Sequence, residues 1–192
     1  MTDLVLDPSR SRVRIQTFAE GLLARLAHDL ELVCGELSGI ASGPSDASDP
    51  GDPGTSGTAR LEAPLRGMVV AGVLGKDGRV DPRGLSASDQ RDAIAKMQHD
   101  VFHSGPEGVV RIETHYDGDT ARVRLVPPRG KVVEAVVEPE VTITADAVHA
   151  KGSFEVSLTA IGSAPVKGPM GAFRVKDRVK VIFDVVFTPA KA

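Results

Sequence analysis

The ten residues Arg178-Val-Lys-Val-Ile-Phe-Asp-Val-Val-Phe187 indicate the fold more clearly than any other stretch of this chain. Five hydrophobic side chains in it recur at every second position: Val179, Val181, Phe183, Val185 and Phe187. Successive side chains of a β-strand point to opposite faces of its sheet, so this spacing predicts a long strand with one hydrophobic face.

The same period of two recurs in earlier stretches of the chain. These stretches lie at residues 11–17, 60–65, 110–114, 122–125 and 154–159. Asp117-Gly118 and the run Pro127-Pro128-Arg129-Gly130 are typical turns between such strands. Polar residues at the intervening positions suit an antiparallel sheet, which can keep one face in water. We count about eight strands, which predicts an all-β, eight-stranded antiparallel barrel whose interior holds side chains or one small ligand.

Two segments depart from this alternation. Ser86-Ala87-Ser88-Asp89 has the spacing of a helix N-terminus, which predicts one short helix near residues 88–99, packed at an end of the barrel with Ile94 and Met97 inward. Residues 41–57 hold only Gly, Ser, Pro, Ala, Thr and Asp, a composition that predicts a flexible loop. Because alternation resumes on both sides of that loop, residues 1–192 are interpreted as a single domain.

Composition and charge argue against several classes of protein. The 192 residues carry a formal net charge of −3, and nucleic-acid binding usually requires a strongly basic face. No hydrophobic stretch reaches the roughly 20 residues of a membrane-spanning helix. The N-terminal residues, with Asp3 and no basic run before a hydrophobic stretch, do not resemble a secretory signal. We therefore expect a soluble, cytoplasmic protein.

The sequence contains no motif that we associate with catalysis or with a cofactor. It has no phosphate-binding loop, dinucleotide fingerprint or nucleophile elbow, so we expect neither an enzyme nor a cofactor. His99 and His103 have the four-residue spacing of helical metal ligands, but no third ligand is near in sequence, and no metal is predicted. The single cysteine, Cys34, excludes an internal disulfide. It alternates with Leu30 and Leu32, which favours a buried, unreactive thiol.

Four short motifs follow one another along nearly the whole chain. They are Asp7-Pro8-Ser9-Arg10-Ser11, then Gly21-Leu22-Leu23-Ala24-Arg25-Leu26-Ala27-His28-Asp29, then Arg91-Asp92 followed by His99, and finally Met170-Gly171-Ala172-Phe173-Arg174-Val175-Lys176-Asp177. Together they resemble the YceI-like family of bacterial, lipocalin-like domains, many of which are periplasmic. The resemblance implies a lipocalin-like barrel with a helix at one end and a tunnel that accepts a polyisoprenoid or a similar long-chain amphiphile.

Two sets of residues are candidates for such a ligand site. The candidates for lining the tunnel are Leu22, Leu26, Met97, Phe102, Phe154, Val156, Leu158, Met170 and Phe173. The candidates for contacting a head group at the tunnel mouth are His28, Asp29 and Arg174. A structural role is the alternative for each set, because a solid core needs the same hydrophobic residues and the pair His28-Asp29 also suits a turn or a metal.

The first functional hypothesis is therefore non-catalytic binding, transport or sequestration of an isoprenoid, quinone or lipid. The alternative is a protein-interaction module with a side-chain-filled barrel and no small ligand, which would use the 41–57 loop and the basic residues of the closing segment. An enzyme built around His28 and Asp29 is a third hypothesis. A homodimer stays open under each of them.

Overall fold

A computed structural model describes residues 2–21, 27–43, 56–168 and 173–190 of the chain. Its strands are β1 (Thr2–Leu6), β2 (Arg12–Thr17), β3 (Ala19–Glu20), β4 (Leu30–Cys34), β5 (Ser38–Gly43), β6 (Ser56–Pro64), β7 (Met68–Leu74), β8 (Val80–Asp81), β9 (Val109–Asp117), β10 (Thr120–Val126), β11 (Val133–Val137), β12 (Glu140–Ile143), β13 (Val148–Ser157), β14 (Arg174–Val175) and β15 (Arg178–Pro189). Its helical elements are η2 (Leu65–Gly67), α1 (Ala87–Lys96) and η3 (Met97–Val101). The fold is thus mostly β, as predicted.

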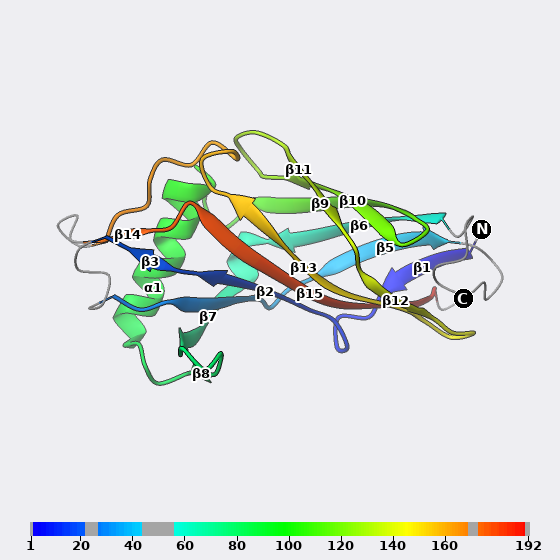
Figure 1. The fold of residues 1–192 in the computed structure, drawn as a ribbon, viewed down its shortest axis with the longest axis horizontal. Coiled ribbons are helices and arrows are strands. Elements are labelled where there is room, and N and C mark those ends of the chain that lie inside the picture. The colour runs from blue at the N-terminus through cyan, green and yellow to red at the C-terminus, as the bar shows by residue number, and fades with distance from the viewer. Residues whose placement is uncertain (1, 22–26, 44–55, 169–172, 191–192) are drawn as a thin grey trace.

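Thirteen of the strands in these ranges form one antiparallel sheet that curls strongly into a half-barrel (Figure 1). Strand β15, which contains the run predicted at residues 178–187, pairs with β1 and β2 along one edge and with β13 along the other. The strand order continues from β1 through β5, β6, β9 and β10 to β11, and from β2 through β4 and β7 to β8. The curl brings β11 next to β13, so the concave side of the sheet surrounds an interior.

The number of strands differs from the predicted eight because long strands are broken by bends. Strands β1 and β2 pair with consecutive parts of β15, and between them the Asp7 carboxylate accepts hydrogen bonds from the backbone and hydroxyl of Ser9. Strand β5, which pairs with β1, and strand β4, which pairs with β2, are likewise two separate strands. Strands β6 and β7 are also separate, with η2 between them. The buried positions change from even to odd numbers between β1 (Leu4, Leu6) and β2 (Val13), and from odd to even between β6 (Leu61, Ala63) and β7 (Met68). Such a shift does not tell whether the chain turns back or bends and continues, so the pattern alone does not show the bends.

The predicted flexible loop at residues 41–57 is wrong at both ends. Residues 41–43 belong to β5 and residues 56–57 to β6, and the two strands pair with Ser42 opposite Thr58. The hydroxyl oxygens of these two residues lie 2.8 Å apart. Strand pairing uses backbone groups, so small and polar residues can extend a ladder that composition does not reveal. Residues 44–55 lie outside the described part of the chain.

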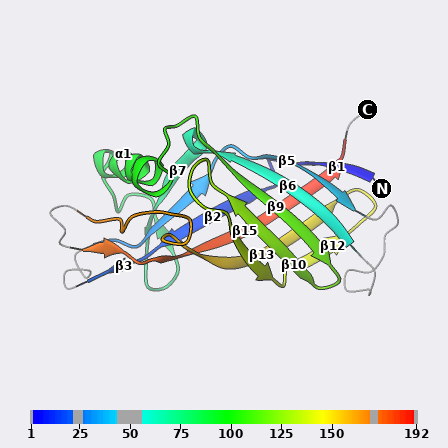
Figure 2. The same ribbon diagram turned by 90° about the horizontal axis from the view of Figure 1, so that it is seen from above.

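Helix α1 is found where it is predicted, at the end of the sheet opposite the two termini (Figures 1 and 2). Ser86 is its N-cap and accepts a hydrogen bond from the backbone N–H of Asp89. Helical structure runs past the expected end near His99, because the chain continues as the π-helical turn η3 to Val101. The buried side chain of Gln98 in this turn donates to the carbonyl oxygen of Leu65 at 3.3 Å, which ties the turn to η2.

Replacing Ser86 by alanine is expected to lower the free energy of unfolding by about 1 kcal/mol, because the first turn of α1 loses its side-chain cap. Urea denaturation measures this change. Ser88→Ala is the matched control, since Ser88 is an exposed residue inside the same turn. Equal losses in the two variants would show that the cap contributes nothing.

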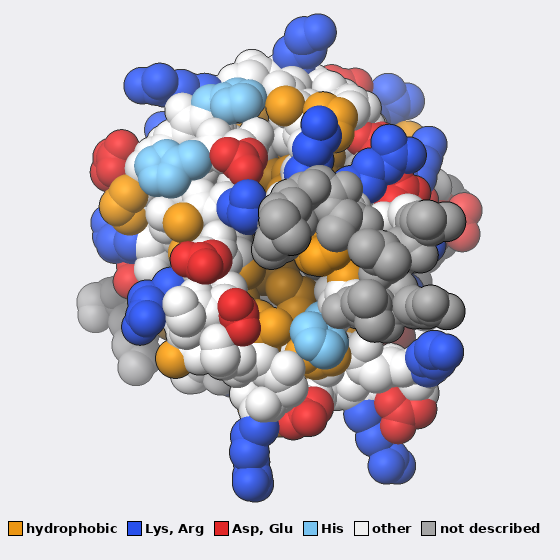
Figure 3. Space-filling view, turned by 90° about the vertical axis from the view of Figure 1, so that its left-hand side faces the viewer, with side chains coloured by type: hydrophobic (Ala, Val, Ile, Leu, Met, Phe, Trp, Pro, Cys, Tyr) orange, Lys and Arg blue, Asp and Glu red, His pale blue; other side chains and the backbone are white. Residues whose placement is uncertain are grey.

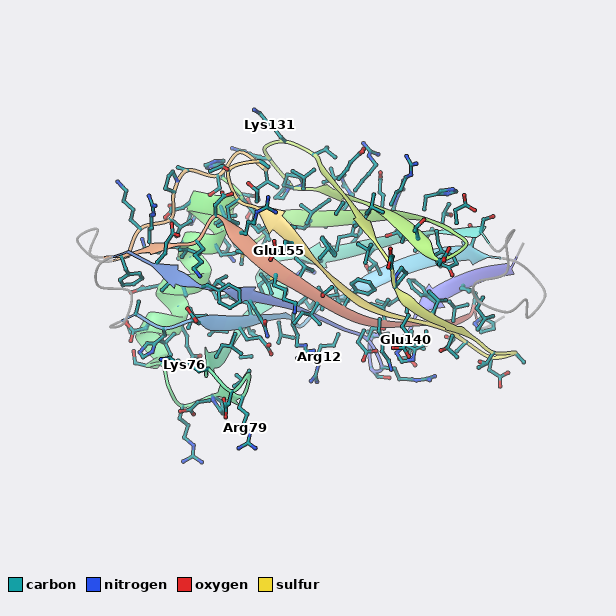
Figure 4. All side chains as sticks on the ribbon, in the orientation of Figure 1. Arg12, Lys76, Arg79, Lys131, Glu140 and Glu155 are labelled. Atoms are coloured by element: carbon teal, nitrogen blue, oxygen red, sulfur yellow. The ribbon has the colours of Figure 1, made fainter. Side chains whose placement is uncertain are left out.

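The two faces of the sheet differ in chemistry. Inward positions carry the buried hydrophobic residues, and the charged side chains lie on the outside, where Arg12, Lys76, Arg79 and Lys131 point away from the interior (Figure 4). Glu113 on β9 bridges Arg60 on β6 and Arg124 on β10 across the outer face. In the described residues, no helix has both the length and the hydrophobic content required to span a membrane.

Candidate functional site

The concave side of the sheet encloses two cavities. The larger, of about 500 Å³, lies at the end that carries α1, and the smaller, of about 140 Å³, lies toward the opposite end of the sheet. Hydrophobic side chains form the floor of a hollow in the α1 end of the molecule (Figure 3). The larger volume falls within the range of roughly 300–1,000 Å³ that is usual for small-molecule sites.

Alternate residues of several strands build the walls of the larger cavity. Those of β2, β4, β9 and β15 are Val13, Ile15, Thr17, Leu30, Leu32, Cys34, Val110, Ile112, Val179 and Val181. The period of two brings every second side chain of a strand to the concave face, while its neighbours face outward. The alternation read from the sequence therefore produces the hydrophobic wall directly.

One face of α1 closes the end of this cavity. Asp89, Asp92, Ala93 and Lys96 of α1 line it together with Met97, the first residue of η3, and they share the spacing of three and four residues that places side chains on one side of a helix. Asp89, Asp92 and Lys96 are exposed, whereas Met97 is half-buried. The helix thus presents a polar rim to solvent and a hydrophobic side chain to the interior. Asp89, Asp92 and Lys96 were not among the predicted site residues, although their spacing of three and four residues puts them on one face of the predicted helix.

The structure brings five of the predicted lining residues together at the larger cavity. They are Met97, Phe102, Val156, Leu158 and Phe173. Phe154 instead lines the smaller cavity, where its ring centroid lies 6.3 Å from that of Phe183. Leu22, Leu26 and Met170 lie outside the described residues. Contact of any of these side chains with a ligand stays a prediction.

The three predicted head-group residues have different surroundings. His28 is exposed and lines the larger cavity. The Asp29 carboxylate accepts a hydrogen bond from the backbone N–H of Ala19 at 2.8 Å, which holds the start of β3 beside β4. Arg174 pairs with Glu20 at 2.6 Å across the small sheet formed by β3 and β14. Asp29 and Arg174 therefore have structural partners, and a role with a ligand stays a prediction for all three.

Cys34 contributes a neutral group to the cavity wall. Its side chain is buried, and its sulfur lies 3.4 Å from the sulfur of Met68. Burial raises the pKa of the Cys34 thiol to about 12, because the thiolate would lose its hydration in these surroundings. At neutral pH the group is a thiol that packs as a small hydrophobic side chain.

We expect folded protein to react with a thiol reagent at pH 8 at least about a hundredfold more slowly than unfolded protein, because only the thiolate is the nucleophile. The measurement is the rate of labelling by 5,5′-dithiobis(2-nitrobenzoate) with and without urea. Protein unfolded in urea supplies the reference rate for the same cysteine. Comparable rates in the two states would contradict a buried, neutral Cys34.

No family model matches this chain, and no curated protein matches it. Among solved structures it is similar to BcnA of Burkholderia cenocepacia, with a TM-score of 0.58 and 15% sequence identity over 94% of this chain and 98% of that chain. The fold is lipocalin-like. At this level of identity the likeness concerns the fold alone, so membership of the YceI-like family stays a prediction.

Proposed function

We propose that the chain binds a long-chain hydrophobic amphiphile, such as an isoprenoid, a quinone or a lipid, and carries or sequesters it without catalysis. The observation on which this proposal rests is the cavity of about 500 Å³ whose walls are built from inward-facing hydrophobic residues. A protein-interaction module with a filled barrel would require these side chains to meet in the middle. The open volume favours the binding proposal over that alternative.

The size of the cavity suits a long hydrocarbon tail. A dry cavity of about 150 Å³ holds one benzene molecule, so the larger cavity would hold three groups of that size, or on the order of 18 carbon atoms. Burying that many carbons would contribute roughly 14 kcal/mol gross at about 0.8 kcal/mol each. Binding itself costs roughly 4–15 kcal/mol in lost freedom. A tail must therefore fill most of the cavity before binding becomes strong.

The distribution of polar residues sets the orientation of such a ligand. Leu32, Val156 and Val179 are buried hydrophobic residues of the strand walls, whereas His28 and Lys96 lie exposed at the α1 end. A polar head group left in the interior would lose its hydration without gaining hydrogen bonds. We therefore place the tail between the strands and the head group at the mouth beside α1.

Titration of delipidated protein with the fluorescent long-chain acid cis-parinaric acid tests the proposal. The expected result is saturable binding of one molecule per chain with a dissociation constant in the micromolar range or below. Unlabelled long-chain alcohols should displace the acid, and native mass spectrometry should detect the one-to-one complex. Failure to bind the acid, together with the absence of any bound alcohol by mass, would refute the proposal.

A further inference from the structure

The two cavities meet at a common wall. Of the residues that the structure describes, three line both cavities, namely Val13 of β2, Ile112 of β9 and Val181 of β15. All three side chains are buried. We refer to them as the constriction. The two cavities are therefore adjacent, and we refer to them as the larger and the smaller chamber.

The constriction is formed from two sides of the interior. Val13 and Val181 lie on neighbouring strands, since β2 pairs directly with β15. Ile112 belongs to β9, which the sheet reaches from β15 only after β1, β5 and β6. Hydrophobic side chains from two separate parts of the sheet thus lie between the two cavities, and the space between the cavities depends on the size of these three residues.

Beyond the constriction the smaller chamber is also built to receive hydrocarbon. Phe154 of β13 lines it, together with Phe183, Val185 and Phe187 of the long strand β15. Gly152 of β13 lies opposite Phe183, and a β-carbon at Gly152 would come within 2.6 Å of the Phe183 ring. The missing side chain therefore leaves the space in which this ring packs. At about 140 Å³ the chamber is close to the volume that holds one benzene-sized group.

We propose that the smaller chamber is a second binding site, which receives the end of a ligand tail too long for the larger one. This inference rests on the proposed function. A tail of on the order of 18 carbons fills the larger chamber, and roughly five or six further carbons fill the smaller one. The ligand class is then an amphiphile with a single tail of about 20 to 25 carbons, and the constriction determines whether the additional length contributes to binding.

The test compares prenyl alcohols of 15, 20 and 25 carbons, each measured by displacement of cis-parinaric acid from the full chain. In the unaltered protein we expect the 25-carbon alcohol to bind at least tenfold more tightly than the 20-carbon alcohol, since one more prenyl unit leaves water. Val181→Phe narrows the passage and is expected to remove this tenfold gain. Ile182→Phe is the matched control, because position 182 lies outside both cavities on the same strand, and it should keep the gain.

The outcomes separate this inference from the proposed function. If all three alcohols bind but the affinity stops rising at 20 carbons, the second chamber takes no part in binding. The same conclusion follows if Val181→Phe and Ile182→Phe show an equal gain in affinity from the 20-carbon to the 25-carbon alcohol. If circular dichroism shows that Val181→Phe does not fold, Val181→Ala replaces it. The smaller side chain should increase the gain in affinity from the 20-carbon to the 25-carbon alcohol. An unchanged gain would overturn the inference. If the unaltered protein binds no alcohol and no cis-parinaric acid, the proposed function fails, and this inference fails with it.

Discussion

Replacing Ala93 by tryptophan is expected to weaken binding of a long-chain alcohol by roughly 50-fold. Ala93 lies on the face of α1 that lines the larger cavity, so an indole at this position would occupy space otherwise open to the ligand. Exclusion of three CH₂ groups costs about 2.4 kcal/mol, which corresponds to this loss of affinity. Displacement of cis-parinaric acid measures the effect.

Ala95→Trp provides the matched control for this variant. Ala95 belongs to the same helix but is exposed and lies outside both cavities, so its replacement should leave the affinity within about twofold. Circular dichroism and the midpoint of thermal unfolding establish that both variants fold. Equal affinities for the two variants would mean that the ligand does not occupy the space beside α1.

Leu65→Ala is expected to destabilise the protein by about 3 kcal/mol, within the range of roughly 2–5 kcal/mol that is usual for a truncated core leucine. Leu65 is 0% exposed and lies at the junction between β6 and β7. Its backbone N–H donates to the carbonyl oxygen of Gly108, and its carbonyl accepts from the side chain of Gln98. The alanine variant would leave a cavity where η2, η3 and the start of β9 meet.

Urea denaturation of two further variants completes this test. Leu65→Met conserves volume and is expected to cost less than about 1.5 kcal/mol. Arg66→Ala removes an exposed neighbour whose ion pair with Glu36, at 3.0 Å, should contribute at most about 1 kcal/mol. A loss from Leu65→Ala that is no larger than the loss from Arg66→Ala would contradict the role of Leu65 in the core.

The strands and the helix could be predicted because their signals are local. Alternation at residues 178–187 and 110–114 corresponds to β15 and β9, and the spacing that begins at Ser86 corresponds to the N-terminus of α1. The bends that divide β1 from β2 and β6 from β7 could not be predicted, because the buried positions shift by one residue across each bend and a shift of this kind does not tell whether the chain turns back or continues. The short pairing of β3 with β14 joins segments about 150 residues apart and has no signal in either segment.

The cavity itself was the harder feature to predict. Val156 and Leu158 are buried and line the larger cavity, but the alternation that singled them out would suit the lining of a solid core equally well. Whether a hollow remains depends on the separation of the walls, which is set by the curl of the whole sheet and the position of α1. The acidic residues Asp89 and Asp92 were missed for a related reason, since only the position of the helix shows that they face the mouth.

The most direct test of the central claim is a crystal structure of the protein with a long-chain alcohol that carries bromine on the last carbon of its tail. We expect an anomalous peak inside the curled sheet, with the polar head beside Lys96 and the bromine deep among the strand residues. Interior side chains packed against one another, with the bromine found only on the outer surface, would contradict it.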